Sequence, residues 1–137
     1  MLKDTIYISE EYLKIWAEYD KAQPLILKLE ENNYIFKIAL LVKEIPGENN
    51  LFEAYSPYGY GGPVLIEGND ESKFPLEKFL KELEKGEIID LFIRFSPFLE
   101  NHKYFPSKYI SLNRYTISRH LEKSTPETIL KTFSKGT

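Results

Sequence analysis

The 137-residue chain contains no cysteine, which excludes disulfides, thiolate metal ligands and a cysteine nucleophile. It also has no run near the roughly 20 apolar residues that a membrane-spanning helix requires. Asp4, Glu10 and Glu11 stand where a secretory signal peptide would have a basic start and an apolar stretch. We therefore expect a cytoplasmic protein without a membrane span.

Familiar catalytic and cofactor signatures are missing as well. The serines Ser56, Ser96, Ser118 and Ser134 lack the Gly-x-Ser-x-Gly elbow of many hydrolases. The glycines near residue 60 are not followed by Gly-Lys-Ser/Thr and do not have the spacing of a dinucleotide fingerprint. No group of His, Asp and Glu has the spacing of metal ligands, so we predict no metal site. The catalytic residues stay unassigned.

Charge is modest in total and unevenly distributed. The net charge of −3 at pH 7 argues against a general nucleic-acid binder. Residues 1–100 carry 11 Lys and Arg against 19 Asp and Glu, whereas residues 101–137 carry 7 against 2. The basic final third either meets a phosphate-bearing substrate or an acidic partner, or it neutralises the rest of the same domain. The length and the 42% of hydrophobic residues predict one globular domain, residues 1–137.

Apolar residues recur at helical spacing in three stretches. The predicted helices run from the cap Ser9 to about Tyr19, from Pro75 to Gly86, and from Thr125 through Ile129, Leu130 and Phe133. The apolar stripe of the last helix must be covered, either by this domain or by a further part of a longer protein. In the second case, the isolated chain should dimerise or aggregate through that stripe.

Six further stretches have the apolar character of strands. They run from Leu25 to Leu27, Tyr34 to Ile45, Leu51 to Tyr55, Pro63 to Ile66, Ile88 to Phe95 and Tyr109 to Leu121. On the second, apolar residues from Tyr34 to Val42 line one face, and Lys37 and Lys43 mark the other. The nearly continuous apolar run from Ile88 predicts a central strand. The fold class is therefore α+β, with a mostly antiparallel sheet and flanking helices.

The segment Ser56-Pro57-Tyr58-Gly59-Tyr60-Gly61-Gly62-Pro63, here called the glycine-tyrosine loop, is the most informative feature. Its glycines permit backbone angles that other residues avoid, and its prolines fix φ, so it cannot belong to a helix or a central strand. It lies between two predicted strands and presents two tyrosines. They either contact a ligand or pack as lids on the core.

Arg94 is the most specific candidate for a polar ligand contact outside this loop, because it lies near the end of an apolar strand. A buried guanidinium needs a partner, which is either a ligand carboxylate or phosphate, or an internal ion pair with Asp90 or Glu53. Asn101 follows in the next loop, where it either contacts a ligand or bonds its own backbone. His102 and His120 are candidate acid–base groups by type, and each is more typical of a surface residue.

These residues carry a family resemblance. The string SPYGYGGP, followed by the run from Leu91 to Asn101 (LFIRFSPFLEN), resembles the amino-terminal half of FemAB-like proteins of the GNAT superfamily of acyltransferases. The resemblance covers the chain from Leu25 to its end. Relatives of this kind often carry His where this chain has Ser96. In the family, a segment like residues 133–137 continues into a basic helix and a second GNAT-like domain.

The resemblance implies a GNAT-like fold and an acyl or aminoacyl transferase that acts on a sugar nucleotide or a cell-wall precursor. The residues it places at the acceptor are Tyr58, Gly59, Tyr60, Gly61, Gly62, Arg94 and Asn101. The Arg/Gln-x-x-Gly-x-Gly/Ala turn with which GNAT enzymes bind acyl-CoA is missing here. The chain is therefore expected to hold no cofactor. Either the acyl-CoA or aminoacyl donor binds a missing second domain, or the donor is not acyl-CoA. The expected partners are a small-molecule or sugar-nucleotide acceptor and either a second GNAT-like domain or a second copy of the chain in a homodimer.

An interpretation from a different class stays open beside this one. In it, the chain is a non-catalytic domain whose aromatic loop and basic final third contact a protein partner. The two hypotheses share the same residues and differ in what those residues touch.

Overall fold

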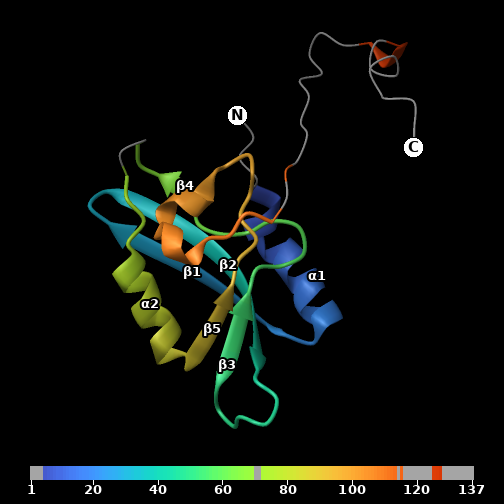
Figure 1. Cartoon of the computed structure of the whole chain (residues 1–137), viewed down its shortest axis with the longest axis vertical. Coiled ribbons are helices and arrows are strands. Elements are labelled where there is room, and N and C mark those ends of the chain that lie inside the picture. Colours follow the sequence, from blue (N-terminus) through green and yellow to red (C-terminus); the bar gives the residue numbers. More distant parts are fainter. Residues whose placement is uncertain (1–4, 70–71, 114, 116–124, 128–137) are drawn as a thin grey trace.

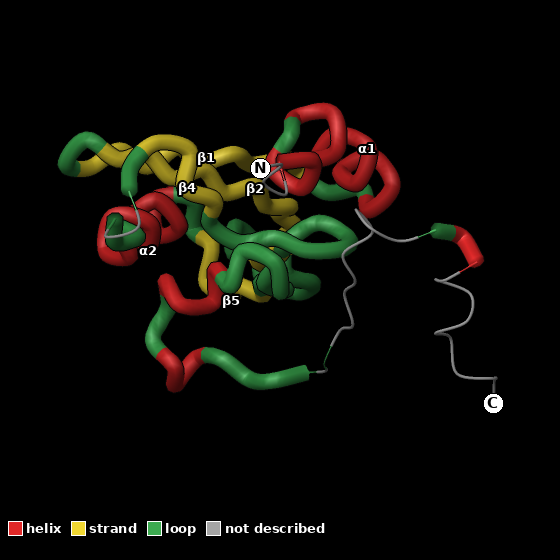
Figure 2. Tube along the Cα trace, turned by 90° about the horizontal axis from the view of Figure 1, so that it is seen from above, coloured by secondary structure: helices red, strands yellow, loops and turns green. Residues whose placement is uncertain are grey.

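Two helices enclose a five-stranded sheet in the computed structural model, which describes residues 5–69, 72–113, 115 and 125–127. Helix α1 (Glu10–Asp20) covers one face of the sheet and helix α2 (Leu76–Lys85) covers the other (Figure 1). Figure 2 shows these helices at opposite ends of the view, with strands between them. The α+β class is confirmed.

The remaining elements follow the predicted order closely. The strands are β1 (Gln23–Glu31), β2 (Tyr34–Glu44), β3 (Phe52–Tyr55), β4 (Val64–Glu67) and β5 (Ile88–Phe92), and the 3₁₀ turns are η1 (Thr5–Ile8), η2 (Asn101–Tyr104) and η3 (Ser107–Tyr109). Ser9 caps α1 as predicted, because its hydroxyl accepts a hydrogen bond from the Tyr12 amide at 3.3 Å. Gly86 ends α2, as predicted, with a negative φ of −86°. The residue after it, Glu87, has the left-handed backbone conformation (φ 56°).

Strand β2 organises the sheet. Along one edge it pairs with β1, through a tight turn in which Asn32 and Asn33 have φ of 46° and 66°. Along the other edge it pairs first with β4, at residues 35–37, and then with β3, at residues 41–44. Strands β3 and β4 therefore follow one another along the same edge of β2, and the glycine-tyrosine loop connects them.

Strand β2 is buried on both faces, which the sequence pattern did not predict. Phe36, Ile38 and Leu40 pack with α2, as the expected apolar face does. On the opposite face, Ala39 and Leu41 are buried under α1. The flanking lysines at 37 and 43 suggested a polar face, but α1 covers the residues that lie between them.

Strand β5 is an edge strand, so the predicted central position is wrong. It pairs with β3 alone, in parallel, and it ends at Phe92, three residues before the predicted Phe95. A register shift opposite Phe52 breaks the alternation. As a result, Ile88 and Leu91 contact the α2 side of the core, whereas Ile89 and Phe92 are exposed. The continuous apolar run predicted a strand that is buried on both faces. The register shift explains why Ile89 and Phe92 are exposed instead.

The strand predicted from Tyr109 to Leu121 is wrong in its described part, because Tyr109 closes η3 and residues 110–113 form no strand. Residues 116–121 lie outside the described residues. The apolar stripe of the predicted last helix, Ile129, Leu130 and Phe133, lies outside them too.

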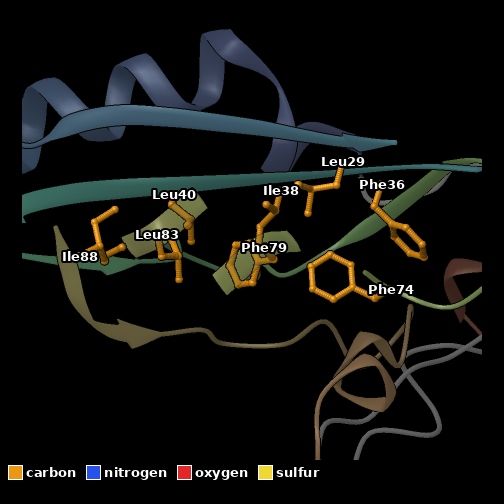
Figure 3. Close-up of a cluster of buried hydrophobic side chains, with 9 residues drawn as sticks. Leu29, Phe36, Ile38, Leu40, Phe74, Phe79, Leu83 and Ile88 are labelled. Atoms are coloured by element: carbon orange, nitrogen blue, oxygen red, sulfur yellow. The ribbon is translucent and has the colours of Figure 1, made fainter. Parts of the chain in front are cut away.

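The larger of two core clusters fills the space between the sheet and α2. Figure 3 shows it as a row, with Phe36 and Phe74 at one end and Leu83 and Ile88 at the other. Phe79 of α2 lies in the middle of the row and is fully buried. Burial of such side chains supplies the main stabilising free energy of the domain.

The second cluster joins α1 to the sheet and includes a polar link. The Tyr55 hydroxyl of β3 donates a hydrogen bond to Asp20 Oδ2 of α1 at 3.0 Å. Burial, together with the neighbouring carboxylate of Asp20, raises the pKa of Tyr55 to about 12. Tyr55 therefore stays protonated in the folded protein at pH values where it ionises in the unfolded chain.

This shift gives a pH dependence of a definite sign. Below about pH 10 both states hold the proton, so the link contributes its full stability. Between about pH 10 and pH 12 the unfolded state loses the proton first, so the free energy of unfolding should fall as pH rises. Urea denaturation at pH 9, 10 and 11 measures how far the free energy of unfolding falls with pH. This fall should be smaller for Tyr55→Phe than for the wild type, and an equal fall in both proteins would contradict the raised pKa of Tyr55.

Candidate functional site

The glycine-tyrosine loop connects β3 and β4, as predicted. Gly59 and Gly62 have φ of 93° and 99°, which confirms the expectation that a glycine here adopts a positive φ. Pro57 and Pro63, near its two ends, are fully buried. Between these anchors the chain rises to the surface and presents Tyr58.

Hydrogen bonds join the loop to the chain that follows β5. The Ser56 amide donates to the Phe92 carbonyl at 2.9 Å, and the Gly61 amide donates to the Arg94 carbonyl at 2.7 Å. The Arg94 amide donates to the Ser56 hydroxyl at 3.0 Å. The loop thus has a fixed shape, because both of its halves bond the same extended segment.

Asn101 ties a second loop to the first. Its side-chain amide donates to the carbonyls of Gly61 (2.8 Å) and Pro63 (3.2 Å), and its Oδ1 accepts from the Ser96 amide (3.0 Å). The side chain is fully buried. Where the sequence suggested a bond to its own backbone, the amide instead crosses to residues about 40 positions earlier in the chain. In this conformation Asn101 positions the glycine-tyrosine loop and does not reach the surface.

The three glycines are required by close packing. A Cβ atom on Gly59 would lie 2.6 Å from the Tyr7 ring, and one on Gly61 would lie 2.4 Å from Ser56 Cβ. A Cβ on Gly62 would lie 2.6 Å from the Asn101 amide nitrogen. These contacts are shorter than carbon atoms tolerate, so the loop can approach its neighbours only without side chains there.

Turn η1, helix α1 and the glycine-tyrosine loop together form an aromatic surface, which consists of Tyr7, Tyr12, Trp16, Tyr19, Tyr58 and Tyr60. Tyr58 stacks on Trp16 with ring centres 5.0 Å apart and planes 28° apart. Tyr19 meets the edge of Trp16 at 5.3 Å, and the Tyr12 hydroxyl donates to the Tyr58 carbonyl. Tyr58 and Tyr19 are 70% and 78% exposed, so the surface faces solvent.

The contribution of α1 to this surface was missed from the sequence. The helical spacing of Tyr12, Leu13, Trp16 and Tyr19 predicted one apolar face of an amphipathic helix. Leu13 of this set is buried and Trp16 packs against the same core cluster, whereas Tyr19 is exposed. The signal that could have identified an exposed face is the choice of tyrosine and tryptophan, which are suited to sites that are apolar on one side and wet on the other.

Arg94 lies over the ring of Tyr60, with its guanidinium carbon 5.3 Å from the ring centre. Tyr60 in turn meets the edge of Tyr7 at 5.9 Å. The guanidinium is half-buried, and in the described part of the chain it forms no ion pair with Asp90 or Glu53. The cation is therefore held by an aromatic face, which leaves its fork of donors without a carboxylate.

The hollow that borders the loop is very small. It measures about 10 Å³ and is lined by Tyr7, Tyr60, Gly61, Gly62 and their neighbours. Pockets for small ligands usually enclose several hundred Å³. This surface is therefore a flat platform and does not enclose a ligand by itself.

The other polar candidates have structural positions. The Ser96 hydroxyl accepts hydrogen bonds from the Phe98 and Leu99 amides at 3.3 and 3.4 Å, so it shapes the turn before η2. His102 is exposed beside the Phe95 ring, and His120 lies outside the described residues. Within the described ranges, His, Asp and Glu residues form no group able to hold a metal ion. No helix among these residues has the length and apolarity to span a bilayer.

The structure brings the predicted site residues into one region. Tyr58, Gly59 and Tyr60 contact α1 or η1, and Gly61 and Gly62 contact Asn101 and the chain around Arg94. No protein-family model matches the chain, and no curated protein or solved structure matches it.

Two glycine substitutions separate the close packing of the loop from its backbone conformation. Alanine at Gly47 (φ 83°), in open space, should cost about 1 kcal/mol of stability, because a Cβ opposes that φ. Alanine at Gly62 (φ 99°) should cost about 1–3 kcal/mol more, because its Cβ meets the Asn101 amide. Urea denaturation of the two variants measures the difference, and equal losses would show that the contact can relax freely.

Proposed function

We propose that the chain is the acceptor-binding domain of a FemAB-like acyl or aminoacyl transferase, with a GNAT-like fold. The resemblance of the glycine-tyrosine loop and of the run around Arg94 motivates this proposal. The order of the described elements supports it: a helix, antiparallel strands, a helix and a further strand. The acceptor would be a sugar nucleotide or another cell-wall precursor.

One observation carries the proposal: a stacked aromatic pair lies on the same surface as a guanidinium that has no carboxylate partner among the described residues. The outer face of Tyr58, supported from below by Trp16, offers a flat apolar area to a sugar ring or a base. Arg94, held over Tyr60, offers a planar fork of donors to a phosphate. A sugar nucleotide contains both of these groups.

The flatness of the platform fits a shared site. A hollow of about 10 Å³ cannot surround an acceptor, so a second wall is needed to exclude water and to orient the reacting amine. In this proposal, that wall belongs to a second GNAT-like domain or to a second copy of the chain. The same partner would carry the acyl-CoA or aminoacyl donor. The residues of this chain bind and position the acceptor, and none is assigned a catalytic step.

The flat platform also favours a second candidate, a non-catalytic domain that binds a protein. Exposed tyrosine and tryptophan side chains are frequent anchors of protein interfaces. Such a domain would use Tyr58 in the same way but would have no need of a phosphate ligand at Arg94. The two candidates therefore differ in their response to a sugar nucleotide.

A binding titration with uridine diphosphate N-acetylglucosamine as the probe tests the proposal. Tyr58→Ala removes the stacking face and should weaken binding about fivefold or more. Arg94→Gln removes the charge and should weaken it by a similar factor, most strongly at low salt. Tyr109→Ala is the matched control, because Tyr109 is equally exposed (71%) and does not belong to the aromatic surface.

Isothermal titration calorimetry measures the affinities, and thermal unfolding checks that each variant is folded. Binding that is reduced by the first two substitutions and unchanged in the control supports acceptor binding. If the probe does not bind the wild type, or if all three variants bind alike, the acceptor proposal is wrong and the protein-binding candidate takes its place.

A further inference from the structure

In the described part of the chain, the outer edge of β5 is open, and the residues of the aromatic surface do not belong to it. β5 is the last strand of the sheet, and no other described strand pairs with its outer side. The Phe92 and Arg94 carbonyls accept hydrogen bonds from the Ser56 and Gly61 amides, so both turn inward. Main-chain groups alternate in direction along an extended chain, so those of Leu91 turn outward, toward the open edge.

An apolar hollow of about 260 Å³ adjoins this edge. Leu80 and Leu83 of α2 form one wall, and Ile88, Ile89 and Leu91 form the other. Figure 3 places Leu83 and Ile88 together at one end of the core row, so the hollow continues the core toward the surface. It is large enough to receive one or two apolar side chains of a neighbouring strand.

Large apolar side chains stay exposed at the hollow and along β5. Leu80 and Ile89, which line the hollow, are 50% and 63% exposed, and Phe92, the last residue of β5, is 66% exposed. Natural edge strands are usually blunted or covered, because an open apolar edge invites pairing with another chain. An edge with an adjoining hollow has the two components that strand addition uses: main-chain partners and side-chain pockets.

The acidic residues near the hollow favour a strand that contains basic residues. The exposed residues Glu84 and Glu87 line the hollow, and Asp90 borders it with its side chain on the opposite face of β5 from Leu91. No Lys or Arg in the described ranges lies within ion-pair distance of these three residues. A strand with Lys and Arg residues is therefore complementary. A second copy pairing symmetrically through β5 would instead bring its own acidic residues toward these, and the register shift in this short strand also opposes such pairing.

We propose that β5 is a docking edge for an extended peptide in which apolar and basic residues alternate. The peptide adds a strand to the sheet. Its main chain bonds the outward groups of Leu91 and its apolar residues enter the hollow on the α2 side. Its cations project from the opposite face, beside Asp90, in the field of all three carboxylates. This site is separate from the proposed acceptor site, so either proposal can fail without the other.

A synthetic acetylated heptapeptide, Lys-Val-Arg-Val-Lys-Val-Arg, is the probe, and fluorescence anisotropy of a labelled form measures its affinity. The double variant Glu84→Lys/Asp90→Lys should bind about tenfold more weakly or worse, because repulsion replaces attraction. Glu48→Lys/Glu67→Lys is the matched control. It makes the same change in net charge at exposed positions away from the hollow and should bind like the wild type.

Two N-methylated peptides test the main-chain pairing, one methylated at the valines and the other at the basic residues. A strand uses alternate amides on its paired edge, so one peptide should lose binding and the other should keep it. Hydrogen exchange measured by NMR should slow at the Leu91 amide on binding of the unmethylated probe.

The opposite results overturn the proposal. Equal binding of both methylated peptides would indicate a charge contact without strand addition. Undiminished binding by Glu84→Lys/Asp90→Lys would place the peptide elsewhere. Protection of the Leu91 amide before any peptide is added would mean that the chain, or a second copy of it, already covers this edge.

Discussion

The buried side-chain amide of Asn101 is the interaction on which the arrangement of the site depends. It bonds two carbonyls of the glycine-tyrosine loop and one amide of the turn after β5. A buried amide in this position is costly to leave unpaired, so the two loops have to keep this one relative position. The position of Tyr60 beneath Arg94 follows from it, because Tyr60 precedes the bonded Gly61 and Arg94 is two residues before Ser96.

The sheet explains why such a link is needed. Strands β3 and β4 share one edge of β2, and the loop between them leaves the sheet and returns within eight residues. The main-chain N–H and C=O groups of this loop have no partners in a neighbouring strand of the sheet. They form hydrogen bonds with Asn101 and with the segment that follows β5 instead. The loop that carries Tyr58 and Tyr60 is therefore held on one side by Asn101 and the segment after β5, and α1 packs against it on the other.

Much of the fold could be predicted from local patterns. The Ser9 cap and the glycine-tyrosine loop each act through the backbone of a few residues, so their sequence signals are direct. The position of β5 could not be predicted in this way, because it depends on a register shift against β3. The role of Asn101 was equally hidden, since its partners are distant in the sequence. The exposure of Tyr19 on α1 could not be predicted from its spacing, because tyrosine suits both cores and surfaces.

The β1–β2 hairpin has a consequence for how the domain folds. Its nine paired positions are joined by a two-residue turn, so they close with little loss of chain entropy, whereas β5 must find β3 across more than 30 residues of intervening chain. We expect the hairpin to form the early scaffold, on which the two helices condense. We expect the edge strand and the glycine-tyrosine loop to assemble late, so that they are the parts of the molecule that open first when it fluctuates.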